Sequence, residues 1–289
     1  MNVNVKFVFV HGEERQMTET IGFIGLGDLG LPLAANLLDA GHAMRVYNRA
    51  ARKAAPLVAH GAHLATRPTD VVTSGGIVVS VLWDDAALES VVNSDGFLER
   101  LGPGGVHIAM STILPETARR LAALHAQHGC AYVEAPVFGR PEAAVARKLW
   151  VPVAGAQAAK DRARPLLEAM GAQDVFDFGE AVGAATTVKL AGNFLIISAA
   201  RSMGEALSMA AGTGVDPRAL VDMLTTTLFP APIYQSYGRM IAEGAPAVSQ
   251  SDIPLKDIGL FTRTAEGVRS PTPISGRLHE LLESADRRL

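Results

Sequence analysis

Short apolar runs alternate with amphipathic stretches from residue 20 to about residue 180. Runs with the length and composition of buried strands cover residues 21–24, 43–47, 76–82, 106–110, 132–137, 150–154 and 174–178. Between them, apolar residues recur at helical spacing, which predicts helices from Leu29, over 84–93, from Pro115 to His128 and over 158–170. Strands and helices that alternate in this way predict a mostly parallel sheet with helices on both faces.

The pattern changes after Gly179. Residues 182–211 contain no proline and carry apolar side chains along their whole length, which predicts one helix of about thirty residues, roughly 45 Å long. Further helices are predicted to start at Asp216 or Pro217, at Pro254 and at Pro273, and no strand is predicted beyond residue 180. We therefore expect one α/β domain over residues 17–180 and an all-helical domain over residues 181–289, joined by the long helix.

Residues 1–16 are a separate N-terminal extension of uncertain status. A short apolar stretch over residues 3–10 precedes polar residues. No small-residue cleavage site follows, so a secretory signal is not expected. An extra edge strand and an artefact of start-codon choice are the alternatives. We favour the second, because Met17 would begin an ordinary domain of this kind.

The segment after the first predicted strand carries the pattern G-x-G-x-x-G, over Gly25, Leu26, Gly27, Asp28, Leu29 and Gly30. Gly25 allows a tight turn, Gly27 lets the backbone approach a pyrophosphate, and Gly30 permits close helix–strand packing. The free N–H groups of the helix N-terminus attract phosphates. The bare pattern fits a merely structural turn equally well, but the strand, the helix and the second strand around it predict a dinucleotide site in a Rossmann-type, doubly wound sheet.

The end of the second strand indicates which dinucleotide binds. A site for NAD usually has a carboxylate there, which holds the ribose 2′-OH and would repel a 2′-phosphate. This chain has Asn48 and Arg49, with Arg52 and Lys53 one helical turn further on. The planar guanidinium of Arg49 suits a phosphate. A solvated basic helix face is the alternative, and NADP is the expected cofactor.

Composition narrows the classes of function. The 289 residues are 48% hydrophobic and 19% charged, with a formal net charge of −3. This charge gives no electrostatic case for nucleic acid or an anionic membrane, and no apolar run reaches the length of a membrane span. Cys130 is the only cysteine and fits a reducing compartment, so a cytoplasmic protein is expected. No fourth residue with metal spacing accompanies His125, His128 and Cys130, so no metal site is expected.

Three further segments carry candidate chemistry. Ser111 and Thr112 follow the carboxyl end of a predicted strand, where doubly wound folds place ligands. Residues 134–140 follow another strand. Lys189 and Asn193 share one face of the long helix. A helical lysine usually extends to solvent or pairs with a carboxylate, but the apolar neighbours of Lys189 favour partial burial, which lowers a lysine pKa into the range useful for proton transfer.

These motifs, in this order, resemble the β-hydroxyacid dehydrogenases, which include 3-hydroxyisobutyrate dehydrogenase and the glyoxylate/succinic semialdehyde reductases. The resemblance covers nearly all of residues 20–289 and implies a Rossmann domain, an interdomain helix and a helical domain, assembled as homodimers or homotetramers. It implies that Lys189 is the catalytic lysine with Asn193 beside it. The residues implied near the cofactor are Leu82, Trp83, Ser111, Thr112 and Lys256, and those near the substrate are Thr112, Phe138, Gly139, Arg140 and Asp257.

One segment departs from this family. Members that bind small hydroxyacids typically read Ala-Pro-Val-Ser-Gly-Gly, whereas this chain has Phe138, Gly139 and Arg140 after Ala-Pro-Val. Phe138 removes a hydroxyl donor and adds bulk, Gly139 keeps the close backbone approach, and Arg140 either binds a carboxylate or points to solvent. Residues 138–150 also resemble the imine reductases, although these usually replace the lysine at the position of Lys189.

The expected function is an NADP-dependent oxidoreductase in which hydride passes between NADPH and a small aldehyde or keto acid, or the corresponding hydroxyacid, with Lys189 as general acid and base. An imine reductase-like enzyme is the first alternative. A non-catalytic NADP-binding sensor is the second. Phe229, Tyr234 and Tyr237 are candidates for an aromatic pocket wall, with core packing as the alternative for each.

Overall fold

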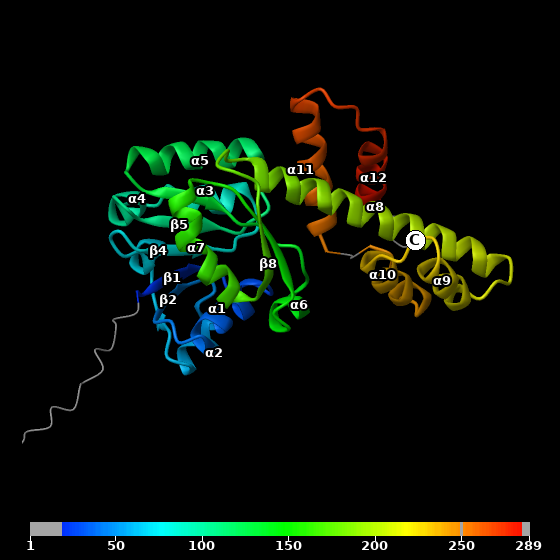
Figure 1. Cartoon of the computed structure of the whole chain (residues 1–289), viewed down its shortest axis with the longest axis horizontal. Helices are drawn as coiled ribbons and strands as arrows, with labels where there is room; N and C mark the ends of the chain where they lie inside the picture. The colour runs from blue at the N-terminus through cyan, green and yellow to red at the C-terminus, as the bar shows by residue number, and fades with distance from the viewer. Residues whose placement is uncertain (1–18, 249–250, 285–289) are drawn as a thin grey trace, which may run out of the picture.

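The computed structural model describes residues 19–248 and 251–284, so the extension over residues 1–16 lies outside the described residues. Six parallel strands form the main sheet in the order β3-β2-β1-β4-β5-β6 (Figure 1). The strands are β1 (Ile21–Ile24), β2 (Met44–Tyr47), β3 (His63–Leu64), β4 (Ile77–Ser80), β5 (Val106–Ala109) and β6 (Ala131–Glu134). This order is that of the Rossmann fold, and the expected α/β class is confirmed.

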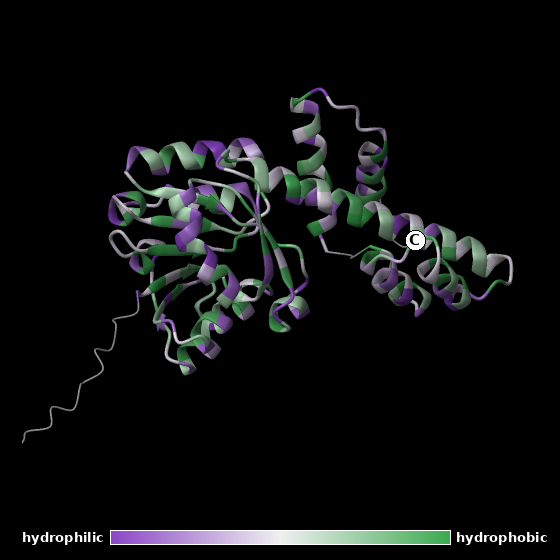
Figure 2. Ribbon diagram, viewed as in Figure 1, coloured by the Kyte–Doolittle hydropathy of each residue, from purple (hydrophilic) through white to green (hydrophobic). Residues whose placement is uncertain are grey.

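Apolar cores cover both faces of the sheet because successive strand residues point to opposite sides. Val79 and Ile108 belong to the core beneath α1 and α7, whereas Val78 and Ala109 belong to the core beneath α3, α4 and α5. The helices and 3₁₀ turns of this domain are α1 (Gly30–Asp39), η1 (Ala51–Ala54), α2 (Ala55–Ala59), η2 (Pro68–Val71), α3 (Asp85–Val92), α4 (Phe97–Leu101), α5 (Pro115–Gln127), α6 (Pro141–Val145) and α7 (Gln157–Met170). Figure 2 shows the hydrophobic colour concentrated on the strands between these layers.

The last two predicted strands do not join the main sheet. β7 (Leu149–Val153) and β8 (Ala172–Asp177) pair with each other in a separate parallel sheet. Two isolated antiparallel bridges, Glu134 to Ala154 and Phe138 to Trp150, connect the end of β6 to this small sheet. The segment after β6 is thereby held on one side by β7.

The second domain is built around one long helix. α8 (Ala184–Gly212) has 29 residues and runs out of the sheet domain (Figure 1). α9 (Pro217–Thr226) and α10 (Pro232–Ala242) pack near its far end, while α11 (Ile253–Gly267) and α12 (Pro273–Glu283) lie nearer the sheet domain. Among the described residues, no strand follows α8. None of the helices in this part of the chain, or in the rest of the described ranges, is long and apolar enough to span a membrane.

Candidate active site

The glycine loop after β1 has the geometry that a dinucleotide site requires. Gly25 has a φ of 96°, and a Cβ there would lie 2.1 Å from the carbonyl oxygen of Val81. A Cβ on Gly30 would lie 2.0 Å from the carbonyl oxygen of Gly25, so the helix start packs directly on the loop. A Cβ on Gly27 would meet no protein atom within 4 Å. The backbone at Gly27 is therefore open to a phosphate, as the steric argument predicts.

Asn48 holds this loop from the end of β2. Its Oδ1 accepts a hydrogen bond from the backbone N–H of Leu26 at 2.9 Å, and its Nδ2 donates to the carbonyl of Ala50 at 3.0 Å. Both ends of the amide are thus bound to backbone. The side chain of Arg49 is exposed, and no hydrogen bond or ion pair joins it to any described residue. Asp28, the one acid of the glycine loop, is also exposed.

The ends of β4 and β5 meet beside the second domain. Ser111 Oγ accepts a hydrogen bond from the backbone N–H of Leu82 at 2.9 Å. The Nζ atom of Lys256, on α11, donates to the carbonyl of Thr112 at 3.1 Å and lies 5.7 Å from the ring centre of Trp83. The Trp83 side chain is 49% exposed. The structure therefore brings together the five residues implied near the cofactor at these strand ends.

Lys189 begins a chain of polar contacts between α8 and α11. Its Nζ donates to Oδ1 of Asn193 at 2.8 Å, and Nδ2 of Asn193 donates to Oδ2 of Asp257 at 2.6 Å. Oδ1 of Asp257 lies 2.9 Å from Nζ of Lys256. Burial lowers the pKa of Lys189 to about 8; the carboxylate of Asp257 opposes this shift, and the ammonium of Lys256 adds to it. Lys189 thus has a proton that is transferable near neutral pH.

Phe138 packs directly against this chain. Its ring centre lies 4.5 Å from Nζ of Lys189, a distance typical of a cation–π contact. A Cβ on Gly192 would lie 2.4 Å from the Phe138 ring, so the ring reaches this face of α8 because residue 192 is glycine. Gly139 has a φ of 143°, and a Cβ there would lie 2.4 Å from Cδ2 of Leu149.

The side chain of Arg140 reaches another helix, α10. Its Nη1 lies 3.6 Å from Sδ of Met240 on α10, and its Nε lies 3.8 Å from Oε2 of Glu142. The side chain is 59% exposed. Of the residues implied near the substrate, Phe138 contacts Lys189 and Asp257 contacts Asn193, whereas Arg140 contacts Met240 of α10.

The aromatic residues proposed for a pocket wall pack partly on one another. The ring centres of Phe229 and Tyr234 lie 5.0 Å apart, and Tyr234 also packs against the apolar core between α8 and α9. Core packing therefore accounts for Tyr234.

Sequence reasoning gave no role to Glu134, which is 1% exposed at the end of β6. Its Oε2 accepts a hydrogen bond from the backbone N–H of Gly183 at 2.7 Å, and its Oε1 accepts one from the Thr186 hydroxyl. The sequence feature that could have drawn attention to Glu134 is a carboxylate at the end of an otherwise apolar predicted strand. Because its partners lie far along the chain, the sequence does not reveal what it binds.

A second buried polar chain links β4, β5 and α5. Ser80 Oγ lies 2.8 Å from Nε2 of His107, and Nδ1 of His107 lies 3.0 Å from Nε2 of His125. Nδ1 of His125 donates to the Leu121 carbonyl at 2.7 Å, which fixes the direction of every bond in the chain. The thiol of Cys130 donates to the carbonyl of His125. These residues belong to the core, and no group of acidic, histidine or cysteine side chains suited to a metal ion occurs in the described ranges.

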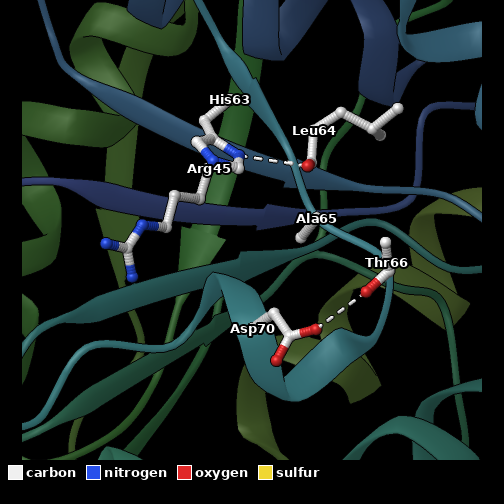
Figure 3. A pocket seen from close by; sticks show the side chains of 6 residues that line it. All are labelled: Arg45, His63, Leu64, Ala65, Thr66 and Asp70. Atoms are coloured by element: carbon white, nitrogen blue, oxygen red, sulfur yellow. Dashed lines mark hydrogen bonds between the residues drawn. The ribbon is translucent and has the colours of Figure 1, made fainter.

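A surface depression lies at the opposite edge of the main sheet. Figure 3 shows its lining, with Arg45 and His63 from β2 and β3 and Asp70 from η2. Thr66 donates a hydrogen bond to Asp70, and His63 contacts the carbonyl of Leu64. β3 and β6 are the two edges of the sheet, so this depression is separated from Glu134 and Phe138 by the width of the sheet. None of the predicted site residues lines it.

Family models match the chain in two consecutive parts. Residues 20–183 match the NAD binding domain of 6-phosphogluconate dehydrogenase. Residues 183–289 match the NAD-binding domain of NADP-dependent 3-hydroxyisobutyrate dehydrogenase. The two models meet at Gly183, directly before α8.

Curated relatives match along most of their length. An uncharacterized oxidoreductase, YfjR, of Bacillus subtilis is 38% identical over 88% of this chain and 90% of its own. The 3-hydroxyisobutyrate dehydrogenase of Pseudomonas aeruginosa is 32% identical over 90% of each chain. The NAD-dependent L-serine dehydrogenase of the same organism is 31% identical over 88% of this chain and 88% of its own.

Solved structures share the whole arrangement. The 3-hydroxyisobutyrate dehydrogenase of Mycobacterium tuberculosis, solved with L-serine, aligns with a TM-score of 0.80 at 28% identity, over 94% of this chain and 96% of its own. Psf3, solved with NADP+ and 2-OPP, aligns at 0.79 and 28% identity, over 91% of this chain and 93% of its own. An imine reductase from a Pseudomonas species shares the fold at 22% identity, with a TM-score of 0.67 over 93% of this chain and 94% of its own.

Proposed function

We propose that this chain, which belongs to the 3-hydroxyisobutyrate dehydrogenase family of NAD(P)-dependent oxidoreductases, reduces the carbonyl group of a small aldehyde or keto acid and oxidises the corresponding hydroxyacid in reverse. The observation that carries the proposal is the position of Lys189. Its partly buried ammonium lies at the junction of α8, α11 and the segment after β6, with its pKa lowered to about 8.

Lys189 is assigned the transfer of the proton. The bound nicotinamide cofactor supplies or accepts the hydride. During reduction, Nζ of Lys189 gives a proton to the carbonyl oxygen as it becomes a hydroxyl, and in the reverse direction the neutral amine accepts that proton. Asn193 orients the amine through its Oδ1. A lysine with a pKa near 8 is largely protonated at neutral pH and still a good acid.

The cofactor is assigned to the glycine loop and the neighbouring strand ends. The backbone from Gly25 to Gly30 holds the pyrophosphate, and Asn48 supports that loop. The nicotinamide end would be held by Leu82, Trp83, Ser111, Thr112 and Lys256, which lie together at the ends of β4 and β5. Arg49 binds a ribose 2′-phosphate, which makes NADPH the preferred cofactor, since no carboxylate stands at the end of β2 to repel it. One relative is named as NAD-dependent and one similar structure contains NADP+. We therefore assign the choice between the two cofactors in this chain to Arg49.

The substrate is assigned to the space beside Lys189. We assign Thr112, Phe138 and Gly139 to binding the substrate, and we assign Arg140, whose guanidinium contacts Met240 of α10, to the margin of the site. Asp257 was expected to contact the substrate. Because its two oxygens face Asn193 and Lys256, we assign it instead to holding Asn193.

The domain division is part of the same proposal. Residues 17–180 bind the cofactor, and residues 181–289 supply Lys189, Asn193 and Lys256 and mediate homodimer or homotetramer formation. Large apolar side chains on the helical domain are more than half exposed in the single chain, which supports self-association: Leu195, Met209, Met223, Leu228, Val268 and Ile274.

A substrate panel tests the proposal. NADPH absorbance is followed with glyoxylate, succinic semialdehyde, methylglyoxal and one cyclic imine, and each assay is repeated with NADH. L-serine and 3-hydroxyisobutyrate are tested with NADP+ in the oxidative direction. Turnover of a carbonyl compound with NADPH preferred supports the proposal. Tight NADPH binding with no turnover of any compound would favour the sensor function.

A second candidate function rests on Phe138. An aromatic ring over the proton donor is a favourable neighbour for a cationic iminium group, and this ring replaces the hydroxyl expected in hydroxyacid enzymes. Turnover of the cyclic imine alone would favour an imine reductase-like activity. Retention of Lys189, which imine reductases usually replace, favours the carbonyl substrate.

A further inference from the structure

We propose that Glu134 is a positioning residue for Lys189. Its carboxylate binds the first turn of α8 and thereby sets the position of the lysine relative to Ser111 and Thr112, the residues after β5 that are assigned to the cofactor. The inference rests on the proposed role of Lys189. It goes beyond that role because it assigns the placement of the lysine to a residue of the sheet domain that touches neither substrate nor cofactor.

Glu134 takes the place of a capping side chain at the N-terminus of α8. The residue before the helix is Gly183, with a φ of 102° and no side chain to cap the helix. The carboxylate of Glu134 takes this place from a distant part of the chain, because Oε2 accepts from Gly183 N–H and Oε1 accepts from the Thr186 hydroxyl. A carboxylate at a helix N-terminus is also favoured by the helix dipole.

The contact between Glu134 and Thr186 lies on the same face of α8 as Lys189. Thr186, Lys189 and Asn193 follow one another at spacings of three and four residues, so they lie on one face of the helix. The hydroxyl that Glu134 binds is therefore one turn before the Lys189 ammonium on the same face. A rotation or a slide of α8 that displaces Lys189 must break the contact between Glu134 and Thr186.

Glu134 is itself held by the neighbouring strand β5 and by Ala154. It pairs with Ala109 at the end of β5, two residues before Ser111. Its own N–H and carbonyl bond with Ala154 beyond β7 at 2.9 and 3.1 Å. Four residues later, Phe138 contacts both Lys189 and Gly192. Residues 134–138 thus contact α8 at two points. Through Glu134, α8 is connected to β5, the strand that leads to Ser111 and Thr112.

Burial raises the pKa of Glu134, and the donors from Thr186 and from the backbone of Gly183, Ala185 and Thr186 oppose that shift. All the groups aimed at the carboxylate are donors, so they fit an ionised carboxylate with no proton of its own. Substitution by glutamine keeps the shape, removes the charge and turns one acceptor into a donor. Glu134→Gln is therefore the variant that weakens the contacts with Gly183 and Thr186 with the least change in side-chain volume.

The test compares Glu134→Gln and Thr186→Val with Thr187→Val. Thr187 is the matched control, because its hydroxyl donates to the Gly183 carbonyl of its own helix at 2.6 Å and does not contact Glu134. The readout is the rate at which acetic anhydride at limiting concentration modifies Lys189, measured by mass spectrometry across a pH series. The exposed Lys148 serves as the internal reference. This readout needs no turnover.

In the wild type, the modification of Lys189 should titrate with a midpoint at about 8. In Glu134→Gln, and to a smaller extent in Thr186→Val, the midpoint should move upward toward the ordinary lysine value, because a displaced Lys189 loses its burial. Thr187→Val should leave it unchanged. Turnover of Glu134→Gln should fall on the order of 10- to 100-fold, with the KM for NADPH within about 2-fold of wild type, as expected for a misplaced catalytic group.

A lowered melting temperature with an unchanged or lowered Lys189 midpoint in both variants would overturn the proposal and leave Glu134 a simple helix cap. Thr186→Val keeps the test valid if Glu134→Gln does not fold. Should Lys189→Ala retain full turnover, the proposed function fails, whereas the labelling result still decides whether Glu134 places Lys189.

Discussion

Nδ2 of Asn193 donates a hydrogen bond to Oδ2 of Asp257 at 2.6 Å, and this bond fixes which end of the Asn193 amide faces Lys189. A carboxylate accepts hydrogen bonds only, so the amide nitrogen turns to Asp257 and the amide oxygen to the lysine. Asn193 lies on α8 and Asp257 on α11. The pair therefore connects two helices and stabilises the ammonium form of Lys189.

The rate of carbonyl reduction should fall as the pH rises above about 8. Lys189 gives its proton during reduction, and its pKa is lowered to about 8 mainly by burial; above this value the neutral amine has no proton to give. The rate of hydroxyacid oxidation should rise through the same pH, since the neutral amine is the base. Profiles of kcat against pH in both directions check this. A reduction rate that stays flat across pH about 7 to 10 would argue against Lys189 as the acid.

Asp257→Asn should shift that profile to lower pH. The carboxylate of Asp257 raises the pKa of Lys189 against the effect of burial, so its removal lets the pKa fall below about 8. Reduction should then begin to decline at a lower pH than in the wild type. Glu266→Gln is the control, because it removes an exposed carboxylate from the same helix. An unshifted profile in Asp257→Asn would show that Asp257 does not act on the lysine.

Arg49→Ser and Asn48→Ala should separate cofactor selectivity from loop support. Loss of the charged hydrogen bonds of Arg49 should raise the KM for NADPH about 10- to 100-fold and leave that for NADH nearly unchanged. Asn48→Ala should weaken the binding of NADPH and NADH equally, because Asn48 supports the loop through the backbone of Leu26 and Ala50. Steady-state kinetics with each cofactor check this. Equal losses for NADPH and NADH in Arg49→Ser would exclude it as the reader of the 2′-phosphate.

Acid should destabilise the protein through its buried histidines. Burial lowers the pKa of His125 from 6.5 to about 4 and holds that of His107 well below its ordinary value. The unfolded chain therefore binds more protons below pH about 6.5, and the free energy of unfolding falls as the pH drops from there toward 4. Urea unfolding at a series of pH values checks this.

His125→Phe should reduce this pH dependence and cost about 1–3 kcal/mol at neutral pH, because His107 Nδ1–H loses its acceptor. His60→Gln changes an exposed histidine and is the control. If the free energy of unfolding of His125→Phe depends on pH as steeply as that of the wild type, the buried chain is not the source of the acid sensitivity.

Much of the fold follows from local sequence. The helix predicted over residues 84–93 is α3, and Asp84 caps it by accepting a hydrogen bond from the N–H of Ala87 at 2.8 Å. The helix predicted over residues 182–211 is α8, and the helices predicted at Pro217 and Pro273 begin there. These features depend on caps, prolines and apolar periodicity within single segments. α10 was not predicted, although apolar side chains recur at helical spacing after Pro232: Ile233, Tyr234, Tyr237, Met240 and Ile241.

Contacts between segments that are distant in the sequence were harder to predict. The sequence predicted strands at 150–154 and 174–178, but apolar patterning does not say which sheet a strand joins, and the two form a sheet of their own. Lys189 and Asn193 were paired by their spacing along one helix. The contacts of Asp257 with Asn193 and of Glu134 with Gly183 join residues 64 and 49 positions apart, and only the folded chain reveals them.

The most direct test of the account is the turnover of Lys189→Ala with NADPH and the best carbonyl substrate of the panel. NADPH affinity, measured by fluorescence titration, should stay close to that of the wild type, since Lys189 is assigned to the substrate and not to the cofactor. The account predicts that kcat falls by about a hundredfold or more, the usual contribution of a general acid. A kcat within a few-fold of the wild type, with NADPH binding intact, would contradict it.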